Sequence, residues 1–140
     1  MNRIFVIVSI AFLAACKANY VEISDDPAVS FYVGKKYVTT HDMEITGINL
    51  PPGYGADVDI YRLGRLYSVQ HESPEIISRK IFPKGGIFTV DKVYECQNCL
   101  GSVKPRYLTV QIFGFDKSVD VPIKISIHEI ESGEHVALVR

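Results

Sequence analysis

Apolar residues alternate with polar ones, at a period of two, through much of the chain from Gly34 to its end. The clearest stretch is Val121–Ile130, in which Ile123, Ile125 and Ile127 fall on one side of an extended backbone. Such alternation indicates β-strands that are buried on one face. No segment keeps an apolar period of 3.6 residues for three turns, so we expect little helix.

Further runs of β-branched and aromatic residues are separated by glycine, proline, asparagine or aspartate. The stronger candidates are Arg106–Phe115 and Ile87–Glu95, and the weaker ones are Lys36–Thr40, Met43–Leu50, Val58–Leu63, Ile76–Phe82 and Val136–Val139. Many short strands at close spacing are typical of a β-barrel or a β-sandwich. The sequence therefore predicts an all-β fold, a small β-barrel or a related architecture.

The composition excludes two broad classes of protein. Hydrophobic residues make up 47% of the 140 residues and charged residues 22%, which is typical of a folded domain and not of a disordered chain. The 15 Lys and Arg residues balance 16 Asp and Glu residues, and no basic run is longer than a pair such as Lys35–Lys36. A nucleic-acid partner is therefore not expected.

The N-terminus has the layout of a secretory signal. Arg3 supplies a positive charge, Ile4–Phe12 is apolar, and small residues precede Cys16. The whole apolar run, Ile4–Ala15, is about twelve residues long, which is too short for a resident membrane-spanning helix. We expect residues 1–15 to be a signal peptide.

The sequence Leu13-Ala14-Ala15-Cys16 resembles the lipobox of bacterial lipoproteins. The resemblance implies cleavage before Cys16, acylation of Cys16 and anchoring in a membrane. It also implies an outer-membrane location facing the periplasm, because Lys17 is not the aspartate associated with inner-membrane retention. An ordinary signal with a chance cysteine, or an uncleaved anchor, is the alternative.

The segment after the signal differs in composition from the rest of the chain. Ser24–Pro27 is rich in turn-forming residues and has no apolar period, so residues 16–33 are predicted to be a tether. Phe31, Tyr32 and Val33 are apolar and could still dock this tether onto the body. Residues 34–140 are predicted to form the β-barrel domain.

Acylation of Cys16 would leave Cys96 and Cys99 as an even pair in an oxidising compartment, where a structural disulfide is the leading interpretation. A zinc site needs about four ligands, and the four histidines are scattered singly. A redox motif needs the first cysteine at a helix N-terminus, which the sequence does not supply. Metal and redox readings remain the alternatives, and no cofactor is expected.

Patterns typical of catalysis are missing. There is no Gly-x-Ser-x-Gly element, and the pairs His71-Glu72 and His128-Glu129 would point to opposite faces if they lie on strands. Asp57 and Asp59 lack the further ligands of a calcium site. We expect no enzyme and no metal site.

Tyrosines near two long loops, residues 49–57 and 67–75, offer a candidate binding surface. Tyrosine supplies a large contact area at low entropic cost and is favoured at recognition surfaces. The candidate residues are Tyr54, Tyr61, Tyr67, Arg62 and Arg65.

Two short motifs suggest a more specific fold. The turn and strand Phe82–Val90 contain Pro-Lys-Gly, and Gly34–Tyr37 opens the body. Together they resemble motifs of uncharacterised envelope lipoproteins that carry an SH3-like small barrel. This resemblance implies a fold and no activity.

These observations favour a non-catalytic, lipid-anchored envelope module that binds an envelope protein, a peptide or peptidoglycan. One alternative is an inhibitor or immunity protein that blocks a hostile enzyme at the membrane through the loop at residues 49–57. The other is a thiol- or metal-dependent activity at Cys96 and Cys99.

Overall fold

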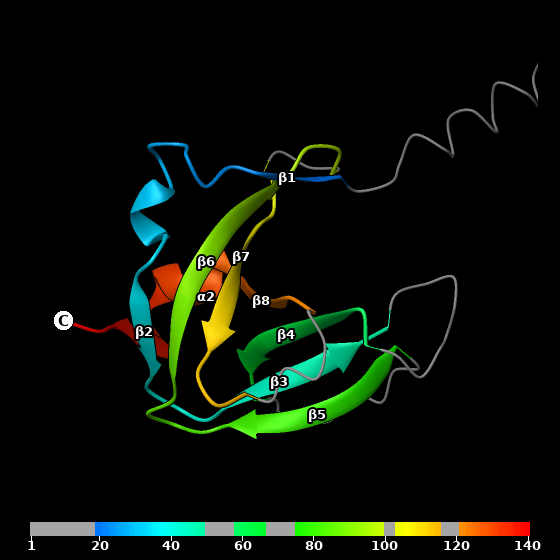
Figure 1. Ribbon diagram of the computed structural model, residues 1–140, viewed down its shortest axis with the longest axis vertical. Coiled ribbons are helices and arrows are strands. Elements are labelled where there is room, and N and C mark those ends of the chain that lie inside the picture. Colours follow the sequence, from blue (N-terminus) through cyan, green and yellow to red (C-terminus); the bar gives the residue numbers. More distant parts are fainter. Residues whose placement is uncertain (1–18, 50–57, 67–74, 100–102, 116–120) are drawn as a thin grey trace, which may run out of the picture.

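One mixed sheet of nine strands makes up most of the described protein (Figure 1). The computed structural model describes residues 19–49, 58–66, 75–99, 103–115 and 121–140. Its elements are β1 (Tyr20–Glu22), the 3-10 helix η1 (Ser30–Tyr32), β2 (Lys36–Thr39), β3 (Met43–Ile48), β4 (Ile60–Arg65), β5 (Ile76–Phe82), β6 (Ile87–Cys96), β7 (Arg106–Ile112), β8 (Ile123–Ser126), α2 (Ile127–Ser132) and β9 (Val136–Leu138). The prediction of an all-β fold is confirmed.

The strand order is β5-β3-β4-β8-β7-β6-β2-β9, and β1 pairs with β6 beside this path. The pairs are antiparallel except for β4 with β8, which is parallel. In Figure 1 the strands β3, β4 and β5 run across the direction of β6 and β7, so the sheet is strongly bent. Within the described residues β5 and β9 do not pair, and the sheet is barrel-like but not closed.

The core lies on the concave side of this bent sheet. Alternate residues of each strand face it, and the fully buried ones include Met43, Ile45, Leu63, Phe88, Val90, Val93, Leu108, Ile123 and Ile125. Val90 and Val93 are three residues apart, a spacing that regular alternation would place on opposite faces. The β6–β7 register shifts between Val90 and Lys92, and this bulge returns Val93 to the core.

The N-terminal segment belongs to the folded body, in contrast to its prediction as a tether. Strand β1 pairs with the end of β6, and Val29 and Tyr32 are buried in the core. The Tyr32 hydroxyl donates a hydrogen bond of 3.1 Å to Glu131 of α2. The turn-forming residues there serve a local purpose, because Asp26 Oδ1 accepts from the Ala28 amide at 2.8 Å. Within the described residues the folded body therefore already includes Tyr20, ahead of the predicted boundary at Gly34.

The strand predicted at residues 121–130 ends at Ser126, and a helix follows. The Ser126 hydroxyl accepts a hydrogen bond from the His128 amide and so caps α2, while Gly133 ends the helix with a φ of 65°. Ile130 packs into the core. His128 and Glu129 therefore lie on a helix and not on a strand.

Neither helical segment of the described chain is long and apolar enough to cross a membrane.

Truncating Val29 tests whether the N-terminal segment is part of the core. Val29 is 1% exposed, whereas Val33, a residue of the same type four positions later, is 36% exposed. We expect Val29→Ala to lower the free energy of unfolding by about 2 kcal/mol, because it removes buried methyl groups and leaves a cavity. Val33→Ala should lower it by less than about 1 kcal/mol. Urea unfolding measures both, and equal effects would contradict docking of this segment.

Because Tyr32 is buried, the free energy of unfolding should depend on pH in the alkaline range. Burial, followed by the hydrogen bond to Glu131, raises the pKa of Tyr32 from 10 to about 12. The folded protein holds the Tyr32 proton more tightly than the unfolded chain does. The stability that the protonated Tyr32 contributes is therefore complete below pH 10 and is lost as the pH rises towards 12. The free energy of unfolding of the wild type, relative to Tyr32→Phe, should therefore fall across this window. A difference that is constant from pH 9 to pH 12 would contradict it.

Candidate functional site

The outer face of the sheet carries a row of cationic and hydroxyl side chains. Strand register places Thr109 opposite Lys124, Lys124 opposite Arg62, Arg62 opposite Thr46, and Thr46 opposite Arg79. Partners in register project to the same side of a sheet, so this row crosses β7, β8, β4, β3 and β5. Three of its five members are positively charged.

A cavity of about 500 Å³ opens at this row. It is lined by Glu44, Thr46, Arg62, Leu63, Gly64, Arg65, Ile76, Arg79, Ser126 and Glu129. Pockets that hold small ligands or ligand fragments have volumes of about 300–1,000 Å³. The cavity is therefore large enough for a ligand, and its lining combines three arginines, two carboxylates and two hydroxyl groups.

Glu44 forms the buried floor of this cavity. It is 6% exposed, and its Oε2 lies 2.8 Å from Arg79 Nη1. The Thr46 hydroxyl donates a second hydrogen bond to the same oxygen at 3.3 Å. A buried carboxylate that is held by an arginine and a hydroxyl is suited to fixing the Arg79 guanidinium in place.

A second ion-pair network holds Arg65, another residue that lines the cavity. Arg65 Nε lies 3.1 Å from Glu129 Oε1, and Arg65 Nη2 lies 3.0 Å from Glu134 Oε2. The other oxygen of Glu129 is buried 3.6 Å from His135 Nδ1, and neither atom has a hydrogen-bond partner among the residues that the structure describes. Helix α2 and the residues that follow it thereby hold Arg65 at the end of β4.

Arg62 differs from the other two arginines. Its side chain is exposed, and within the described residues it makes no ion pair or hydrogen bond. Since Glu44 and Glu129 are bound to Arg79 and Arg65, Arg62 is the guanidinium of the cavity that is open to a ligand.

A cluster of tyrosines borders the row on the other side of Arg62. Lys124 Nζ lies 4.2 Å from the ring centroid of Tyr107 and 5.9 Å from that of Tyr20. Tyr94 stacks on Tyr107 with ring centroids 5.1 Å apart. Burial among these rings lowers the pKa of Lys124 below its ordinary value. Because Tyr107 belongs to β7, these interactions hold the ammonium group on the side of β8 that faces β7.

The sequence candidates are only partly brought together. Arg62 and Arg65 both line the cavity. Tyr61 lies on the opposite face of β4, because adjacent strand residues alternate, and it packs edge-on against Phe115 with ring centroids 5.3 Å apart. Tyr54 and Tyr67, with most of both loops, lie outside the described residues.

The tyrosines that do gather on the outer face, Tyr20, Tyr94 and Tyr107, were not among the sequence candidates. Tyr107 and Tyr94 occupy outward positions of alternating strands, which is a signal that the sequence contains. Tyr20 lies in the segment predicted to be a tether. The contact of Tyr20 with Tyr107 depends on β1 pairing with β6, which no local pattern indicates.

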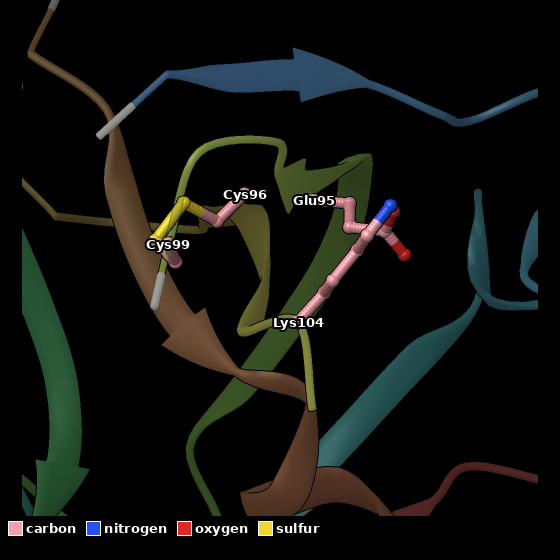
Figure 2. The surroundings of a disulfide bond; sticks show 4 residues. All are labelled: Glu95, Cys96, Cys99 and Lys104. Carbon is pink, nitrogen blue, oxygen red and sulfur yellow. A yellow bond between two sulfur atoms is a disulfide. The ribbon is translucent and has the colours of Figure 1, made fainter. Parts of the chain in front are cut away.

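Cys96 and Cys99 form a disulfide at the end of β6 (Figure 2), which confirms the structural interpretation of the pair. Cys96 is fully buried, and its amide donates a 3.0 Å hydrogen bond to the Pro105 carbonyl. Figure 2 shows the Lys104 side chain extending towards Glu95, and their charged atoms are 3.5 Å apart. The described part of the chain has no group of three or more side chains that could hold a metal ion.

Glu95 links the strand next to this disulfide to β7. Its Oε2 lies 2.7 Å from Arg106 Nη2. The hydrogen bond from Arg106 holds the pKa of the Glu95 carboxyl below its ordinary value. The loop that starts at Cys96 is thus held at its beginning by the disulfide and at its end by the ion pairs of Lys104 and Arg106 with Glu95.

Comparison with known proteins gives no relationship on which a function could be based. No protein-family model, no curated protein and no solved structure matches the chain. The candidate function therefore follows from the residues and geometry described above.

Removing the disulfide should weaken the fold without abolishing it. The loop between Cys96 and Cys99 is short, so closing it removes little chain entropy, and we expect the double variant Cys96→Ser/Cys99→Ser to lose about 1–2 kcal/mol of unfolding free energy. Urea unfolding followed by circular dichroism measures this loss. Added reductant should have no further effect on the variant, and loss of the β signal in buffer would show that the disulfide is essential for folding.

Proposed function

We propose that this protein is a non-catalytic, lipid-anchored module of the bacterial cell envelope, which binds an envelope protein, a peptide or peptidoglycan. The observation that carries the binding role is the cavity of about 500 Å³ on the outer face, with Arg62 open to a ligand. Recognition sites commonly combine aromatic residues with arginine, as this face does.

The envelope location is supported by two independent features. The lipobox-like sequence Leu13-Ala14-Ala15-Cys16 follows a positive and then an apolar segment, as in lipoprotein signals. The disulfide between Cys96 and Cys99 suits an oxidising compartment such as the periplasm. In this proposal Cys16 carries the lipid, and the domain faces the periplasm from the outer membrane.

A binding role, as opposed to catalysis, is supported by the state of the charged groups in the cavity. Glu44 and Glu129 each form an ion pair with an arginine, so both carboxylates of the cavity already have a partner. The ion pairs Glu44–Arg79 and Glu129–Arg65 make the lining rigid and leave Arg62 available to a ligand, an arrangement that favours binding.

The barrel-like sheet is also in keeping with the resemblance to envelope lipoproteins that carry an SH3-like barrel. We therefore propose that the protein is one of these lipoproteins, a recognition domain held at a membrane.

Site-specific photocrosslinking in intact cells tests the proposal. Ile81 lies opposite Glu44 on the outer face and is 58% exposed, and Leu138 on β9 is a similar aliphatic residue that is 52% exposed. A photoreactive residue at position 81 should capture a specific envelope component, whereas one at position 138 should not. Equal capture at both positions, or none at position 81 in a folded and anchored protein, would contradict the proposal.

The same cells test the anchor. Cys16→Ala should release the protein from membranes, and its capture at position 81 should fall because the partner is presented at the membrane. Unchanged membrane association of this variant would refute the lipid anchor. A captured hydrolase of foreign origin would instead favour the inhibitor or immunity function.

A further inference from the structure

We infer that the free edge of strand β5 binds an extended segment of a partner protein, which joins the sheet as a further strand and carries an acidic residue opposite Lys80. This inference rests on the proposed function, because it names the class of ligand, a peptide, and the way in which it is bound. Three features of the described residues lead to it.

The first feature is an unpaired edge of the sheet. Strand β5 is the last strand of the order that begins β5-β3-β4, and within the described residues it pairs with β3 alone. It forms the lower border of the sheet in Figure 1. It has seven residues, whereas β9, at the other end of the order, has three. Seven residues of extended backbone span about 23 Å, enough for a peptide to pair along them.

The hydrogen bonds of neighbouring strands show which backbone groups face this edge. Consecutive residues of a strand direct their amides and carbonyls to opposite edges. The Tyr61 amide donates to the Pro122 carbonyl beside β8, so even-numbered residues of β4 bond to β3. These pair with even-numbered residues of β3, which leaves the odd-numbered residues of β3 to bond to β5. Lys80 pairs with an odd-numbered residue of β3, so the amide and carbonyl of Ile81 face the free edge.

The second feature is the apolar surface along the same edge. Ile81 is 58% exposed and Ile77 is 38% exposed. Ile77 is the extra residue at the point where the register with β3 shifts. Exposed aliphatic side chains beside unpaired backbone groups make an edge strand prone to pairing with another chain. A bound peptide would cover these side chains and use the backbone groups of Ile81.

The third feature is the charge of Lys80, which selects the peptide. Its register partner Ile45 is in the core, so Lys80 projects on the concave side of the sheet. Its side chain is exposed, and its Nζ lies 5.1 Å from the ring centroid of Phe115. Among the described residues no carboxylate forms an ion pair with it. A carboxylate on an added strand, placed opposite Lys80, would supply that partner.

The same charge argues against pairing of β5 with a second copy of this chain. Full overlap of two antiparallel β5 strands would make Lys80 of each copy a diagonal neighbour of the other. A charge that points inward from an edge strand is a known means of preventing such self-association. Adjacent residues of a strand face opposite sides, so the fitting peptide has an acidic residue that faces Lys80 next to an apolar residue that contacts Ile81.

Selection from a peptide library tests the inference. The target is the full-length, lipidated protein in neutral detergent, and the probes are random octapeptides displayed on phage. We expect the enriched peptides to carry Asp or Glu beside a β-branched or aromatic residue, because these residues favour the extended conformation. With the most enriched peptide bound to the wild type, exchange of the Ile81 amide hydrogen should slow by about tenfold or more. The Lys80 amide, which bonds to β3, should change little.

Proline substitution tests the role of the backbone. Ile81→Pro removes the amide hydrogen that faces the edge, a change that edge strands tolerate, and should weaken peptide binding by about tenfold. Leu138→Pro is the matched control on the other end strand. The Val139 amide donates to the Lys36 carbonyl, so the Leu138 amide faces away from β2, and this variant should keep the wild-type affinity. If Ile81→Pro fails to fold, the exchange of the Ile81 amide in the wild type decides.

Charge reversal tests the selection of an acidic peptide. Lys80→Glu should weaken binding by about fivefold, because an ion pair is replaced by repulsion. Lys84→Glu makes the same change in net charge at an exposed residue of the turn after β5 and should leave the affinity unchanged.

The outcomes separate this inference from the proposed function. No enriched peptide, an unchanged exchange rate of Ile81 in the complex, or equal weakening by Leu138→Pro overturns the inference. If the photoreactive residue at position 81 still captures an envelope component in that case, the proposed function stands without strand addition. If peptides bind at the β5 edge but nothing is captured in cells, the peptide site stands and the envelope function fails. Capture of a second copy of this chain at position 81 would also overturn the inference.

Discussion

Strand β6 is the element on which the rest of the structure depends. Along one side it pairs with β7, and along the other it pairs first with β2 and then with β1, so the backbone groups of both sides are used. The change of neighbour falls at the bulge, where Gly34 donates to the Val90 carbonyl and Ile23 to the Val93 carbonyl, both at 2.9 Å. One inserted residue thus keeps the core continuous while three segments distant in sequence join the same strand.

Inward and outward side chains alternate along each strand, so the residues that form the core and most of those that line the candidate site lie on different faces of the sheet. Several carboxylates of its described strands bind arginines or lysines that they help to position, whereas Arg62 of β4 makes no ion pair within the described residues. The residues on the concave side of the same strands are apolar and buried, including Leu63, Ile123 and Ile125. Strands β3, β4 and β5 therefore contribute to the core through one face and present Thr46, Arg62 and Arg79 to the cavity through the other.

Local patterns predicted much of this arrangement, and they failed where distant segments decide the outcome. The strands at Ile87–Glu95 and Arg106–Phe115 follow from alternation and appear as β6 and β7, close to their predicted bounds. The run at Val121–Ile130 alternates equally well, but the Ser126 cap and Gly133 turn its second half into α2. Arg62 and Arg65 were grouped with Tyr61 because they are close in sequence, whereas strand geometry places Tyr61 and Arg62 on opposite faces. Local sequence patterns do not predict the contact of Tyr20 with Tyr107, because this contact depends on the pairing of β1 with the distant strand β6.

The position of β1 bears on the proposed lipid anchor. If Cys16 carries the lipid, only four residue steps join it to β1, and even a fully extended backbone spans about 14 Å over that length. A linker of that length is only about twice as long as the headgroup layer of one leaflet is thick. Under that proposal the domain would lie at the membrane surface, with β1 on the side nearest the lipid. Any partner would then have to come to the membrane, because the module could not extend across the periplasm to meet it.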